Sequence, residues 1–199
     1  MKKLLLSLML ASSFAYAGSG VEYEIGSENG HSAPNWNGPA VTNNWFAITP
    51  WTEWGQGWDA GLKFEGARDN TPGASLENKL EARIRKSYEL GAGFGAGLRV
   101  GVGEDFNQQG PVTGSQQGDF AYYLIEPRLT YEATPNLTPV ISYRYRNAFS
   151  SGHYFQTNTA KIGADYKVTE KDEVGVRYDK KYGGDEHSNG FELTYSRAF

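Results

Sequence analysis

The chain has 199 residues with 25 glycines, 13 tyrosines, 10 phenylalanines, 5 tryptophans and no cysteine. The lack of cysteine excludes disulfides, zinc–thiolate centres and iron–sulfur clusters. A formal charge of −4 offers no basic excess that could neutralise nucleic-acid phosphates. Past residue 17 no apolar run approaches the roughly 18 residues of a transmembrane helix, so a helical membrane protein is excluded as well.

Residues 1–17 have the three parts of an export signal. Lys2 and Lys3 form a positive start, Leu4 to Ala11 form a short apolar core, and Ala15-Tyr16-Ala17 is a small-x-small cleavage site. We therefore expect a signal peptide over 1–17 and a mature domain over 18–199. Such a chain acts in the periplasm, in the outer membrane or outside the cell.

The mature chain alternates apolar and polar residues with the period of two that is typical of β-strands. Val21-Glu22-Tyr23-Glu24-Ile25 is the first example, and Phe191-Glu192-Leu193-Thr194-Tyr195 is the last. The pattern predicts an all-β protein with ten strands, at roughly 20–28, 43–52, 58–67, 77–88, 93–103, 119–132, 137–147, 154–167, 172–182 and 190–199. The faces of the second strand are ambiguous.

Short and mostly longer connections alternate along the chain. The short ones are 53–57, 89–92, 133–136 and 168–171, and the longer ones, which hold all three histidines, are 29–42, 68–76, 104–118, 148–153 and 183–189. This is the pattern of an up-and-down antiparallel barrel whose two ends face different compartments. We expect the short turns to face the periplasm.

Two all-β architectures fit these strands: a secreted soluble barrel or sandwich with its apolar face inside, and a transmembrane β-barrel with that face in lipid. Charged residues at mid-strand positions favour the membrane barrel, as does the terminal Phe199 on an aromatic strand. Aromatic residues near strand ends suit a membrane–water interface; they are Trp45, Trp51, Trp54, Trp58, Tyr88, Tyr131, Tyr166 and Tyr195. The bacterial outer membrane is therefore the expected location.

If the apolar face meets lipid, basic residues of the alternate face line a path through the lumen. The expected path residues are Arg83, Arg85, Arg99, Arg128, Arg144, Arg146, Lys161 and Arg177. The six arginines among them that precede Lys161 come from neighbouring strands, and we call them the arginine wall. Guanidinium groups stay charged and bind carboxylates or phosphates. The alternative is that these charges pair with acids and fill the barrel; inward glycines such as Gly97 and Gly101 favour open space.

The stretch from Ile125-Glu126-Pro127-Arg128 to Tyr143-Arg144-Tyr145-Arg146, with the terminal strand ending in Phe199, resembles the oligogalacturonate-specific porin family of the KdgM type. This resemblance implies a small outer-membrane barrel for acidic oligosaccharides with an arginine-lined lumen, to which Arg128, Arg144 and Arg146 correspond. The family's barrel has twelve strands, so twelve is the alternative to ten.

Together these patterns predict a monomeric porin for small anionic solutes, acidic oligosaccharides among them, with outer-membrane lipids as its surroundings. The alternative is a closed structural or adhesion barrel without transport. An enzyme is not expected: a rim hydrolase using His187 is the least favoured reading, because the chain has no Asp-x-Asp and no Gly-x-Ser-x-Gly. No cofactor, metal site or nucleic-acid partner is expected.

Overall fold

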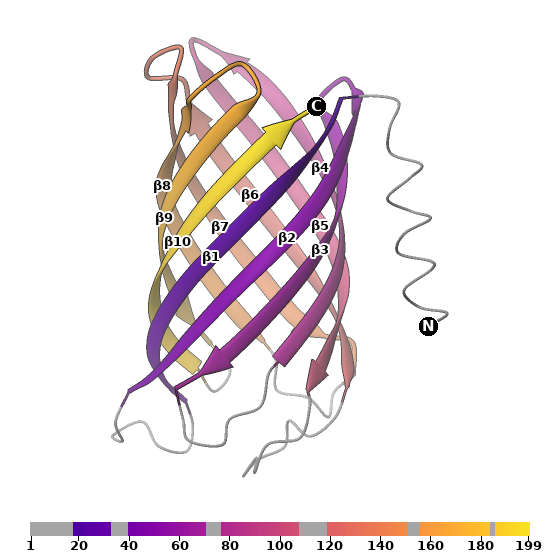
Figure 1. Ribbon diagram of the computed structural model, residues 1–199, viewed down its shortest axis with the longest axis vertical. Coiled ribbons are helices and arrows are strands. Elements are labelled where there is room, and N and C mark those ends of the chain that lie inside the picture. The colour runs from indigo at the N-terminus through magenta and orange to yellow at the C-terminus, as the bar shows by residue number, and fades with distance from the viewer. Residues whose placement is uncertain (1–17, 33–39, 71–76, 108–118, 151–155, 184–185) are drawn as a thin grey trace.

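A computed structural model describes residues 18–32, 40–70, 77–107, 119–150, 156–183 and 186–199. They form a closed antiparallel barrel of ten strands, in which every strand pairs with its neighbours in sequence and β1 pairs with β10 (Figure 1). The strands are β1 (Ser19–Ser32), β2 (Val41–Gly55), β3 (Trp58–Asp69), β4 (Glu77–Gly91), β5 (Phe94–Asn107), β6 (Phe120–Tyr131), β7 (Leu137–Ala148), β8 (Thr157–Lys167), β9 (Asp172–Tyr182) and β10 (Glu186–Ala198). The predicted fold class and strand count are confirmed. The predicted signal peptide, residues 1–17, lies outside the described residues.

The apolar face of the barrel points outward. Mid-strand residues such as Ile25, Leu129, Ile141 and Leu193 are each more than half exposed, which a soluble protein would avoid. The alternate positions on the same strands point inward and are mostly charged, such as Glu24 and Glu192. This is the arrangement of a barrel that has lipid as its outer solvent. In the part of the chain that is described, no helix is long and apolar enough to cross a membrane.

The short turns lie at the end of the barrel where β1 begins and β10 ends (Figure 1). The turn between β2 and β3 holds Gly55, Gln56 and Gly57 at φ values of 88°, 53° and 73°. Glycine adopts this left-handed region without strain, so the two glycines permit a turn that is only two residues long between the strands. We call this end the short-turn end.

Several strands extend beyond their predicted limits at the opposite end. Residues 29–32 of β1 pair with residues 186–189 of β10, where His31 and His187 are Cα partners. The polar composition of these residues predicts loops. Outside the lipid layer, however, a strand needs only backbone partners and no apolar face. The expectation that His31 and His187 lie in loops was therefore wrong.

Two tryptophans of β2 do not belong to the outer aromatic girdle. Trp51 lines the lumen, and the ring of Trp45 lies over the inward-facing Lys63, with the ammonium 5.1 Å from the ring centroid. Each is the Cα partner of a glycine of β1, and the missing glycine side chain leaves space for the indole. Trp54 and Trp58 remain at the outer surface near the short-turn end, where their rings stack at 6.3 Å.

The orientation of the barrel can be tested with single cysteines at its two ends. Ser150 is exposed after β7, and Asn136 is exposed in the short turn before β7. Because short turns of such barrels face the periplasm, we expect a membrane-impermeant maleimide to label Ser150→Cys on intact cells. Asn136→Cys should react only after the outer membrane is permeabilised. Labelling with the reverse pattern would contradict this orientation.

Candidate functional site

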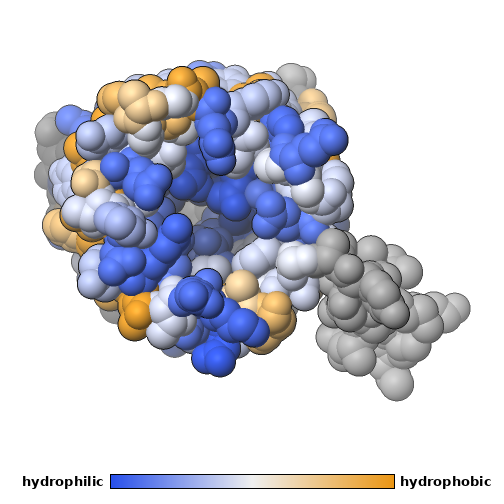
Figure 2. Space-filling view, turned by 90° about the horizontal axis from the view of Figure 1, so that it is seen from above, coloured by the Kyte–Doolittle hydropathy of each residue, from blue (hydrophilic) through white to orange (hydrophobic). Residues whose placement is uncertain are grey.

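The lumen opens at the short-turn end into a cavity of about 1050 Å³. Seen from this end, the barrel is hollowed at its centre, and hydrophilic residues surround the hollow (Figure 2). The cavity runs from rim residues such as Glu53 and Glu170 down to Glu24, Glu126 and Lys161 in the middle of their strands. A charged cavity of this size accommodates a small polar solute.

The structure brings most of the predicted path residues to this cavity. Seven of them line it: Arg83, Arg85, Arg99, Arg128, Arg144, Lys161 and Arg177. Arg85 on β4 and Arg99 on β5 are Cα partners, and Arg128 on β6 is the Cα partner of Gly97 on β5. Like charges opposite one another destabilise a sheet unless anions compensate them, so this wall is suited to negative groups.

The arginines of the cavity differ in how tightly acids hold them. Arg85 bonds Asp59 at 2.6 Å, whereas Arg99 lies 3.5 Å from Glu126, and Arg128 lies 3.8 Å from Asp165. Arg144 makes no ion pair within 4.0 Å among the described residues. Arg99, Arg128 and Arg144 thus have donor capacity directed at the cavity.

Two further cations of the cavity are held more closely. Lys161 pairs with Glu192 on β10, and Arg177 pairs with Asp165 on β8. Carboxylates also gather near the short-turn rim, at Glu53, Glu89, Glu170 and Glu173. The positive character of the cavity is therefore local to the wall that β5, β6 and β7 form at mid-depth.

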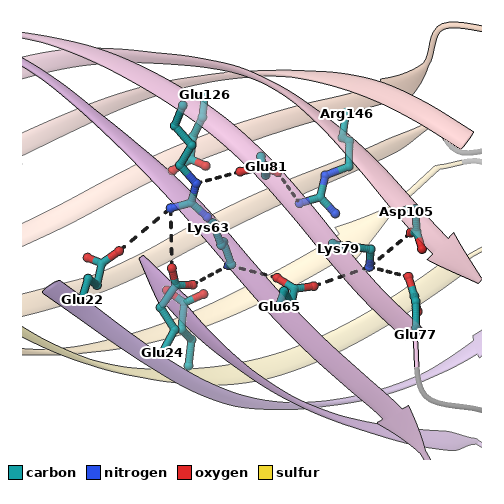
Figure 3. Close-up of polar contacts among 12 residues, drawn as sticks. Glu22, Glu24, Lys63, Glu65, Glu77, Lys79, Glu81, Asp105, Glu126 and Arg146 are labelled. Atoms are coloured by element: carbon teal, nitrogen blue, oxygen red, sulfur yellow. Dashed lines mark hydrogen bonds and ion pairs between the residues drawn. The ribbon is translucent and has the colours of Figure 1, made fainter. Parts of the chain in front are cut away.

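Arg146, the eighth predicted path residue, does not line the cavity. It is buried, 7% exposed, on the side of the cavity that faces away from the short-turn end, 3.5 Å from Glu81 on β4. Arg146 thus lies inside the barrel but outside the cavity, at a level where side chains fill the lumen. The side chains that fill it are charged and lie close together (Figure 3).

We call this filled level the ion-pair layer, and it consists of Glu24, Lys63, Glu65, Lys79, Glu81, Arg83 and Arg146. Lys63 contacts Glu24 at 2.6 Å and Glu65 at 3.0 Å, so β1 and β3 are joined across β2. Glu81 contacts Arg83 at 2.7 Å. The contacts of Glu24 with Lys63 and Arg83, and that of Glu81 with Arg146, link strands that are not neighbours in the sheet, so they close the interior.

Beyond Glu81 an apolar cluster continues the closure. Its members are Phe120, Tyr122, Leu124 and Ala148. Inward glycines do not leave open space here: a Cβ on Gly101 would lie 3.3 Å from Leu124 Cγ, and one on Gly103 would lie 2.5 Å from Tyr122 Cζ. The interpretation of Gly101 as open space was wrong, because the side chain of Leu124 on β6 occupies it.

The chain matches no protein-family model and no curated protein sequence. Its fold is similar to that of the β-domain of the Bordetella autotransporter BrkA, at a TM-score of 0.60 and 13% identity, over 91% of this chain and 99% of that one. The COG4313 outer membrane channel from Pseudomonas putida F1 has a TM-score of 0.56 at 10% identity, over 92% and 96%. The KdgM porin in complex with disordered oligogalacturonate has a TM-score of 0.49 at 10% identity, over 91% of this chain and 99% of that one.

At these identities the comparisons show the fold alone. The protein has the fold of bacterial outer-membrane β-barrels, which the BrkA β-domain and the COG4313 channel share.

Proposed function

We propose that the protein is an outer-membrane porin for small anionic solutes, exported by a signal peptide over residues 1–17 and acting as a monomer. The observation that carries the proposal is the cluster of Arg99, Arg128 and Arg144 in the cavity, where acids hold them loosely or not at all. Guanidinium groups that keep donors open toward a polar cavity attract carboxylates and phosphates. Acidic oligosaccharides are the solutes that the sequence resemblance implies.

The resident acids shape how selectivity arises. Carboxylates near the rim, such as Glu53 and Glu170, are solvated at the short-turn end, where salt screens them. The arginines lie deeper, between walls of low dielectric, where a charge acts more strongly on a passing ion. Selection for anions is therefore expected at mid-depth rather than at the mouth.

A closed barrel without transport is the second candidate, and the ion-pair layer favours it. Lys63 and Glu81 are only 3% and 2% exposed, and they lie where a solute would have to pass. In that case the charges serve to fill the interior of a barrel that is slightly wider than the eight-stranded ones. The outer loops would then carry the function.

Ion selectivity separates the two candidates. Under a salt gradient across a planar bilayer, we expect the wild type to show a reversal potential that indicates anion preference. The double variant Arg128→Gln/Arg144→Gln should lose much of this preference, and the difference should be largest at low salt, where screening is weak. Lys180→Gln, which removes an exposed cation outside the cavity, should leave the potential unchanged. Cation preference in the wild type would refute the proposal.

A further inference from the structure

The closure of the lumen depends on two glycines of β5. Tyr122 and Leu124 extend from β6 across β5, and they are 0% and 1% exposed. Gly103 and Gly101 have no side chains to obstruct them, so the phenol ring and the isobutyl group lie against the backbone of β5. A sheet strand with ordinary side chains at both positions would leave no room for these two groups.

Tyr122 reaches past β5 to a charge on β4. Its hydroxyl donates a hydrogen bond to Glu81 Oε2 at 3.0 Å. Arg146 on β7 approaches from the other side: its guanidinium carbon lies 5.0 Å from the centre of the Tyr122 ring, and its Nη2 lies 3.5 Å from Glu81 Oε2. Three strands thus meet at one carboxylate oxygen in the interior (Figure 3 shows Glu81 and Arg146).

The contacts of Glu81 are unequal. Arg83, on the same strand, holds the other carboxylate oxygen at 2.7 Å, and Arg83 also lies 3.5 Å from Glu24. The contact with Arg146 is longer, and 3.5 Å is beyond the usual length of a charge-assisted hydrogen bond. If Tyr122 and Arg146 withdrew, Glu81 would keep its arginine partner and would not be left as an unpaired buried charge.

We propose that Tyr122, Glu81 and Arg146 form the constriction that sets which solutes pass, and that the pore opens when Tyr122 and Arg146 separate from Glu81. The ion-pair layer divides along this line because Glu81 and Lys63 keep close partners on the β1, β3 and β4 side, Arg83 at 2.7 Å and Glu24 at 2.6 Å. This inference rests on the proposed porin function. The inference assigns the permeation limit to Tyr122 and Glu81, which are not among the basic lumen residues predicted from the sequence.

Single-channel conductance in planar bilayers tests the constriction. Tyr122→Ala removes the ring, and we expect conductance to rise several-fold with anion preference retained. Tyr122→Phe keeps the ring and loses only the hydroxyl, so it should give a smaller rise. Tyr123→Ala is the matched control, because Tyr123 is the neighbouring residue on the outer face and packs against Tyr145. It should conduct as the wild type does.

A second pair of variants changes none of the three constriction residues themselves. A Cβ at Gly103 would displace the Tyr122 ring, so Gly103→Ala should also raise conductance. Gly66→Ala is its control, because the Cβ there would lie 2.8 Å from Cε1 of Phe46, an exposed ring on the outer face and away from the constriction. Heat-modifiable electrophoretic mobility reports whether each variant forms a barrel. If Tyr122→Ala or Gly103→Ala fails to fold, the conductance of Tyr122→Phe tests the inference instead.

The outcomes separate the inference from the function on which it rests. A conducting wild type with all folded variants equal to it would overturn the constriction and leave the porin function standing. A wild type that does not conduct, beside a Tyr122→Ala variant that does, would support the constriction and overturn the proposal that the wild type is a porin. No conductance in any folded variant would overturn both proposals in favour of a closed barrel.

Discussion

The Glu81→Ala variant should lose about 3–5 kcal/mol of the free energy of unfolding, the range for removal of one partner from a buried ion pair. Glu81 is 2% exposed and compensates Arg83 and Arg146, which are 8% and 7% exposed. Without the carboxylate, two guanidinium groups share a buried layer and lose a charged acceptor. Urea unfolding in lipid vesicles, followed by tryptophan fluorescence, measures the change.

Two further variants give this prediction its controls. Glu89→Ala removes a carboxylate from the exposed end of the same strand and should change the free energy of unfolding by less than about 0.5 kcal/mol. The double variant Glu81→Met/Arg146→Met should recover much of the loss, because an apolar pair can replace a buried ion pair at little cost. A loss below about 1 kcal/mol for Glu81→Ala would mean that water compensates the arginines.

The ion-pair layer also limits how the proposed porin could work. Conduction through a barrel needs a continuous polar path, and Lys63, Glu81 and Tyr122 interrupt it in this conformation. In the proposed porin the cavity and the constriction would have separate tasks: the arginines of the cavity would attract an anion, and the constriction would decide whether it passes. Selectivity and conductance should respond to different substitutions, which is why Arg128 and Arg144 are tested apart from Tyr122.

The strand count could be predicted because an alternating pattern reports which face a residue is on. Val21 to Ile25 and Phe191 to Tyr195 show this clearly, and the structure places their charged members inside. The same pattern says nothing about strand ends outside lipid, where residues 29–32 of β1 pair with residues 186–189 of β10. Burial of an apolar face is the signal, and it is absent there.

What fills the lumen depends on register, which one sequence does not give. Gly97 looks like open space until Arg128 is known to be its partner across β5 and β6. Trp45 and Trp51 look like girdle residues until their glycine partners on β1 are known. Lys79 could have been found, because it lies two residues before Glu81 on the inward face of β4. Its three acidic neighbours come from different parts of the chain.

The outer face provides the other large effect. Leu193 is 53% exposed near the middle of β10, and its neighbour Thr194 lines the cavity. In a lipid bilayer Leu193→Arg should reduce the free energy of folding by about 2–4 kcal/mol, because a guanidinium at the bilayer midplane loses its water.

Thr194→Arg adds the same side chain to the polar interior and should cost much less. Folding titrations of both variants in vesicles, compared with the wild type, measure the difference. A soluble barrel would show the opposite order, since Leu193→Arg would meet water and Thr194→Arg would crowd the interior. Equal costs for the two variants would contradict the assignment of the apolar face to lipid.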